Sequence, residues 1–230
     1  MSERRPVTDW PEEPYPGSWP DHSYVVDADG WVHRVEPDAA APSDWVVRTG
    51  PRTECLDDWL ASRGRPRLEE RTAVLSFGSN RCPAKVLRQG GPMVNLLCST
   101  SGLAAVWSHG TRGDGQVVAT LVAAADHEAE FFVSMCTPQD IALLDEVEGR
   151  GTGYDLVPLD AGQVVLEDGT APQDVSAYVG LRPHRWPVAG RDGHPISLTA
   201  MSQADVATWR AGNPGHWEPA EHHPFGPLIT

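Results

Sequence analysis

Residues 73–80 read AVLSFGSN, an apolar run that ends in a Gly-Ser-Asn turn. The apolar run is typical of a buried β-strand. Pro83 follows soon after the turn, at a position typical of the first turn of a helix. Backbone amides at such a junction of strand, turn and helix can bind a carboxylate or a phosphate. The sequence therefore predicts a strand at 72–77 and an anion-binding turn after it, although a turn without a ligand has the same pattern.

Short strands and few helices are expected on both sides of this turn. Helices are expected near 83–89, at 138–148 and at 203–211, the last of them capped by Ser202. Strands are expected at 102–107, 116–123 and 130–136, and near 155–159, 163–167 and 175–181. This pattern favours an α+β fold in which a small closed or strongly curved β-barrel carries flanking helices.

The chain is expected to have three regions. Residues 1–67 form a Trp- and Pro-rich extension with a hairpin and a short helix that Thr53 caps and Gly64 ends. Residues 68–185 form the barrel domain, and residues 186–230 carry a C-terminal helix and tail that pack on it. The extensions hold most of the nine tryptophans. We expect these indoles to pack on the barrel; narrowing the pocket or forming a protein-binding face is the alternative.

Composition and charge exclude several classes of protein. The formal net charge of −14 argues against a nucleic-acid partner, because no basic field attracts a phosphate backbone. Four cysteines without a C-x-x-C pair predict free thiols rather than disulfides or a zinc site. The longest apolar stretch, at 117–125, is too short for a membrane helix, and no export signal is recognisable. A cytoplasmic protein is expected.

A second motif is LDEVEG at residues 144–149. On a helix that begins at Pro138, Glu148 falls on the apolar stripe, Asp145 lies at its margin and Glu146 points away. The other members of the stripe are Ile141, Leu143, Leu144 and Val147. A partly desolvated carboxylate is suited to general acid–base catalysis. A structural glutamate that binds a core amide or an arginine is the alternative interpretation.

The two motifs, in this order, resemble the γ-glutamylcyclotransferase-like superfamily. That family carries a [YF]-G-S-N loop after its first strand and an L-D-x-x-E-G segment that ends in its catalytic glutamate. Residues 77–80 match the first motif and residues 144–149 match the second. Tyr154 and Tyr178 also lie where similar proteins have a tyrosine, so the resemblance covers roughly residues 72–181.

The resemblance implies a small barrel with a pocket at one mouth and an activity that needs no metal or organic cofactor. Phe77, Gly78, Ser79 and Asn80 would hold the γ-glutamyl part of a small-molecule substrate. Glu148 would take a proton from the α-ammonium group, and the freed amine would attack its own γ-carbonyl. The products would be 5-oxoproline and a free amino acid or amine.

Two residues depart from the family pattern around the loop. Phe77 replaces the usual tyrosine, and Arg81 replaces the usual leucine. We expect Arg81 to pair with an acidic side chain of the protein, the alternative being a substrate carboxylate. Two other functions stay open, namely removal of a γ-glutamyl or similar acyl group from a biosynthetic intermediate, and non-catalytic binding of a small molecule or a protein. The amine half of the substrate and the oligomeric state are also open.

Overall fold

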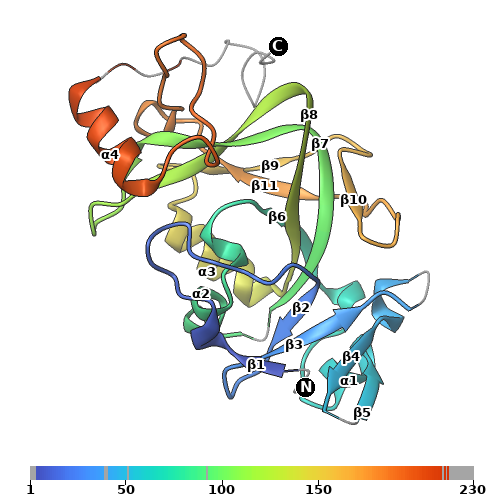
Figure 1. Ribbon diagram of the computed structural model, residues 1–230. Helices are drawn as coiled ribbons and strands as arrows, with labels where there is room; N and C mark the ends of the chain where they lie inside the picture. Colours follow the sequence, from blue (N-terminus) through green and yellow to red (C-terminus); the bar gives the residue numbers. More distant parts are fainter. Residues whose placement is uncertain are drawn as a thin grey trace.

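A computed structural model describes residues 4–38, 41–50, 52–91, 93–213, 215 and 217. These residues form an α+β fold, as predicted, and the fold consists of a large mixed sheet with few helices (Figure 1). The part of the expected C-terminal tail beyond residue 217 lies outside the described residues.

The strands pair into one 11-stranded sheet. Its strands are β1 (Arg4–Pro6), β2 (Tyr24–Val26), β3 (Trp31–Glu36), β4 (Val46–Thr49), β5 (Arg52–Cys55), β6 (Thr72–Ser76), β7 (Val94–Thr111), β8 (Val117–Cys136), β9 (Asp155–Pro158), β10 (Val164–Leu166) and β11 (Ser176–Val179). The α-helices are α1 (Leu56–Ala61), α2 (Pro83–Arg88), α3 (Pro138–Glu148) and α4 (Gln203–Gly212). Ser202 caps α4, as predicted.

The sheet is open in the described part of the chain. The strand order is β5-β4-β3-β2-β7-β8-β6-β11-β9, with β1 added to β3 and β10 added to β7. Because the path has two ends, at β5 and β9, the expected closed barrel is not confirmed. The arrangement is instead a long sheet whose two longest strands, β7 and β8, arch through the molecule (Figure 1).

A single strand, β8, replaces the two strands expected at 116–123 and 130–136. The polar pair Asp126 and His127 lies between the two expected strands, but the ladder with β7 continues past it. Residues 124–127 lie opposite Gly102 alone, in a bulge where Gly102 and Asp126 both adopt positive φ angles, +73° and +57°. A bulge bends and twists a strand pair without ending it, so the polar residues mark a bend rather than a chain reversal.

The N-terminal strands belong to the same sheet as the central ones. The predicted hairpin is formed by β2 and β3, and β2 pairs with β7. The expected cap of α1 is wrong: Thr53 lies in β5, opposite Arg48, and the helix begins at Leu56 without a side-chain cap. Trp45 and Trp59 are fully buried, so these indoles of the extension pack in the core.

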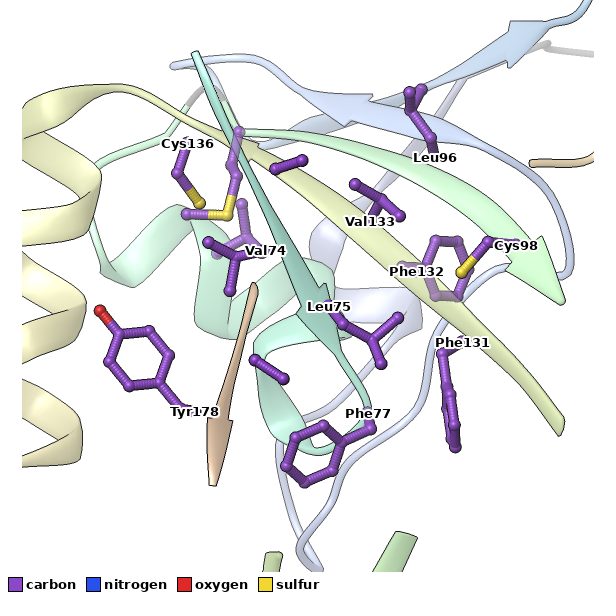
Figure 2. Packing of buried hydrophobic residues seen from close by; sticks show 14 of the residues in the cluster. Val74, Leu75, Phe77, Leu96, Cys98, Phe131, Phe132, Val133, Cys136 and Tyr178 are labelled. Carbon is purple, nitrogen blue, oxygen red and sulfur yellow. The ribbon is translucent and has the colours of Figure 1, made fainter. Parts of the chain in front are cut away.

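Both faces of β6 are covered. Val74 and Leu75 point to opposite faces of the strand, yet both are buried. Figure 2 shows them among side chains of the neighbouring strands, with Phe132 and Val133 of β8 on one side and Tyr178 of β11 near α3 on another. This central strand therefore holds the turn that follows it in a fixed position.

Candidate active site

The strand, the turn and the helix end meet at one cavity of about 170 Å³. Its wall includes seven of the residues singled out from the sequence: Phe77, Gly78, Ser79, Asn80, Glu148, Tyr154 and Tyr178. Arg81 is not among the lining residues. The cavity therefore joins β6, α3 and β11 with the segment that follows α3.

The turn has the predicted form. β6 ends at Ser76, a short 3₁₀ turn covers Ser79–Arg81, and Pro83 is the first residue of α2. Gly78 has φ −106°, so a left-handed conformation is not what requires glycine there. Glycine is required there because space is limited: a Cβ added at Gly78 would lie 2.7 Å from the phenol oxygen of Tyr15.

One hydrogen bond connects the two motifs. Asn80 Nδ2 donates to Glu148 Oε1 over 3.0 Å, although the residues are 68 positions apart. Thr137 and Asp140 cap the start of α3, and Gly149 ends the helix in the left-handed conformation, with φ +63°. Glu148 is therefore held at a defined helix end beside the turn.

The burial pattern of α3 differs in part from the predicted stripe. Glu148 is half-buried and Glu146 is exposed, in agreement with the helical wheel. Leu144 is fully buried, but Val147 is 51% exposed. Val147 lies in the last turn of the helix and lines the cavity. A cavity, rather than packed core, therefore lies beside this end of the stripe.

Two tyrosine hydroxyls bind the same residue of β8. Tyr154 Oη donates to the Ala119 carbonyl oxygen over 2.7 Å, and the Ala119 amide donates to Tyr15 Oη over 2.9 Å. Trp107 of β7 lies opposite Ala119 but forms no backbone hydrogen bond with it. The Trp107 amide donates to the carbonyl oxygen of Ile196, and the Trp107 carbonyl oxygen accepts from the Val188 amide. The two hydroxyls thus satisfy buried backbone groups that no strand pairs. Burial raises the pKa of both phenols, so both stay neutral at pH 7.

Tyr178 fixes the last turn of α3 from the side of β11. Its hydroxyl donates to Asp145 Oδ1 over 2.7 Å, and Arg150 binds the other oxygen of the same carboxylate over 3.1 Å. Burial, together with the hydrogen bond to Asp145, raises the pKa of Tyr178. Tyr178 therefore lines the cavity, and its hydroxyl binds the helix that carries Glu148.

The contacts of Arg81 in the structure differ from the expected pairing with an acidic side chain. Arg81 is 6% exposed and its guanidinium lies over the ring of Trp19, 3.4 Å from the centroid. Its Nη1 donates to the backbone oxygen of Glu130 over 3.2 Å. Burial lowers the pKa of Arg81 to about 10. Arg81 therefore anchors residues 7–23, called the N-terminal arm, to the turn through Trp19. Arg81 does not line the cavity, and no ion pair joins it to a carboxylate within the described part of the chain.

Several solved structures match part of this chain, with TM-scores below 0.5. A structure of γ-glutamyl cyclotransferase is 16% identical, with a TM-score of 0.43, and the match covers 49% of this chain and 68% of that one. An uncharacterised Homo sapiens protein matches with 15% identity and TM-score 0.43, covering 49% of this chain and 68% of that one. An Arabidopsis thaliana protein matches with 17% identity and TM-score 0.42, covering 62% of this chain and 88% of that one.

The other two comparisons are negative. No protein-family model matches the chain, and no curated protein matches its sequence.

Sequence reasoning missed the basic side chains of the cavity and Tyr15. Lys85, Arg88, Arg112 and Arg185 all line it, while Glu148 is its one acidic residue among the described lining positions. The excess of cations is notable in a chain with net charge −14. These residues come from separate segments, so their grouping follows from the fold and leaves no periodic signal in the sequence.

Two further expectations concern metals and membranes. Within the described residues no group of histidine, cysteine, aspartate and glutamate side chains has the arrangement of a metal site. The four cysteines are free thiols, as predicted. Across that same part of the chain, no helix has the length and apolar character needed to cross a membrane.

Proposed function

We propose that this protein releases 5-oxoproline from a γ-glutamyl amine or γ-glutamyl amino acid by intramolecular cyclisation. The observation that carries the proposal is the hydrogen bond between Asn80 and Glu148, 3.0 Å long, which joins the two motifs at one small cavity. A carboxylate that is half-buried and held by an amide donor has the position that a general acid–base group requires.

Glu148 is the proton carrier in this proposal. Its carboxylate takes a proton from the substrate's α-ammonium group, and the freed nitrogen forms a bond to the γ-carbonyl carbon. The bond from that carbon to the leaving nitrogen breaks, and Glu148 returns its proton to the leaving nitrogen. The ring nitrogen loses its second proton to water, and the released amine gains one at neutral pH. Ring closure supplies the proximity of the reacting atoms, so no cofactor is invoked.

The turn and the aromatic residues are assigned to substrate binding. Gly78, Ser79 and Asn80 are proposed to hold the γ-glutamyl group, because the end of a strand followed by a turn presents backbone amides. Phe77, Tyr154 and Tyr178 are proposed as the apolar walls of the same cavity. The four free cysteines suit a reducing compartment, and we propose the cytoplasm as the site of the reaction.

The test is formation of 5-oxoproline, measured by mass spectrometry, from a panel of γ-glutamyl amino acids and γ-glutamyl amines. Removal of general acid–base catalysis lowers rates by about 10²- to 10⁴-fold, so Glu148→Gln should have at most about 1% of wild-type activity. Glu146→Gln is the matched control, because Glu146 lies on the same helix and is exposed. It should keep wild-type activity.

Three outcomes would overturn the proposal or part of it. Equal turnover by Glu148→Gln would remove Glu148 from the mechanism. Absence of product across the panel, with a γ-glutamyl compound still raising the melting temperature, would support a non-catalytic binding protein. Turnover restricted to larger acylated intermediates would support the acyl-removal alternative.

A further inference from the structure

The cavity contains the single lysine of the chain. Of 18 lysine and arginine residues, Lys85 alone is a lysine. It lies in α2, only 7% exposed, and lines the same cavity as Glu148. Lysine side chains are almost never fully buried unless they are paired. A chain that uses arginine for its other basic positions thus places its one compact ammonium group inside the candidate active site.

The contacts of Lys85 leave most of its hydrogen-bonding capacity unused. Its Nζ donates to Ser79 Oγ over 2.8 Å. An ammonium group has three donors, and among the described residues Lys85 forms no ion pair with a carboxylate. Burial lowers the pKa of Lys85, whereas the charge of Glu148 opposes that shift. A buried charge with one neutral partner is unfavourable unless a counter-charge binds beside it.

Adjacent residues of the turn hold groups of opposite charge. Ser79 binds the ammonium group of Lys85, and Asn80 binds the carboxylate of Glu148. An α-amino acid carries the complementary pair, a carboxylate and an ammonium group on one carbon atom. Placed against the turn, its ammonium group would face Glu148 and its carboxylate would face Lys85.

We propose that Lys85 Nζ binds the α-carboxylate of the substrate and that the Ser79–Asn80 turn thereby selects ligands with an intact α-amino acid group. This assignment rests on the proposed function for the identity of the substrate, but the binding itself does not require turnover. A compact ammonium group fits such a confined position better than the larger planar guanidinium of arginine.

A matched pair of substrates tests the assignment by kinetics. γ-L-Glutamyl-L-alanine carries the α-carboxylate, and 4-aminobutanoyl-L-alanine is the same compound without it. A hydrogen bond to a charged group supports an expected loss of about 10- to 100-fold in kcat/KM for the first compound in Lys85→Met, with little change for the second. Arg52→Met is the control, because Arg52 is exposed and is not among the residues that line the cavity. It should keep the wild-type ratio between the two compounds.

A second measurement uses the wild-type protein and needs no reaction. Labelling with lysine enriched in ¹⁵N at Nζ gives one side-chain signal, since Lys85 is the only lysine. Titration with L-glutamate should shift this signal in a saturable way. Titration with 4-aminobutanoate, which lacks the α-carboxylate, should not.

The results separate this inference from the proposed function. A shift with L-glutamate but no 5-oxoproline from any substrate would retain the α-amino acid site and reject the cyclotransferase activity. Normal turnover with an unchanged substrate ratio in folded Lys85→Met would overturn the role of Lys85 and leave the activity. An equal response of the NMR signal to both titrants would also overturn it.

Discussion

Replacing Gly78 with alanine tests how tightly the N-terminal arm packs on the turn. A Cβ at this position would lie 2.7 Å from Tyr15 Oη, whereas the next atoms, Tyr15 Cζ and Ala119 Cβ, are both 3.8 Å away. The shorter distance is a steric overlap and the longer ones are ordinary contacts. The overlap therefore involves a single oxygen atom, and that atom is held in place by the Ala119 amide at 2.9 Å.

The expected free energies follow from these distances. Gly78→Ala should lower the free energy of unfolding by about 1–3 kcal/mol, either through overpacking or through displacement of the Tyr15 hydroxyl. Tyr15→Phe alone should also cost about 1–3 kcal/mol, because it leaves the buried amide of Ala119 without an acceptor. In the Tyr15→Phe background, Gly78→Ala should cost close to nothing, since the clashing atom is gone. The two substitutions should thus be strongly non-additive.

Thermal and urea unfolding of the four proteins measures this coupling. For a chain of this size, about 1 kcal/mol corresponds to a change of about 2–4 °C in Tm. Gly113→Ala is the control, because nothing lies within 4 Å of a Cβ at that position. Additivity within about 0.5 kcal/mol would refute the reasoning. So would a Gly78→Ala variant as stable as the Gly113→Ala control.

Four other substitutions give further tests in unfolding experiments. Leu144→Ala should lower the free energy of unfolding by about 2–5 kcal/mol because the side chain is fully buried, whereas Val147→Ala, at an exposed position, should change it by about 0.5 kcal/mol or less. Gly110→Ala should destabilise strongly, because its Cβ would overlap the backbone oxygen of His184, which cannot rotate away as a side chain could. The hydrogen bonds from its arginine partner lower the pKa of Glu12. Glu12→Gln should therefore destabilise at pH 7, and this difference should vanish as the pH falls below about 4 and protonates the folded-state carboxyl.

The segment from β6 to α2 is predictable from sequence because independent local signals agree there. The apolar run, the glycine of the turn and Pro83 each favour the same succession of strand, turn and helix. The face of α3 on which Glu148 lies follows from helical periodicity, which depends on neighbouring residues alone. The role of Glu148 in catalysis remains a prediction.

The course of β8 is not predictable in this way. Whether the polar residues at 126–127 reverse the chain or bulge from a strand depends on β7, where Gly102 provides the matching irregularity. The same holds for the closure of the sheet, which depends on whether the end strands β5 and β9 meet. The bulge and the closure of the sheet both depend on pairing between segments that are distant in the sequence. The residue pattern within one segment therefore does not predict them.

The N-terminal arm and the turn at residues 77–81 are mutually dependent. Arg81 is buried with its charge over Trp19, so the arginine is stable there only while the arm covers it. Tyr15, four residues before Trp19, fills the space beside Gly78 and supplies a phenol hydroxyl at the cavity, where Phe77 has none. A chain without the arm would expose the guanidinium and leave the Ala119 amide unpaired, immediately beside the residues that hold Lys85 and Glu148. The arm therefore forms part of the lining of the cavity through Tyr15. Removal of the arm should disorder the turn before it enlarges the cavity.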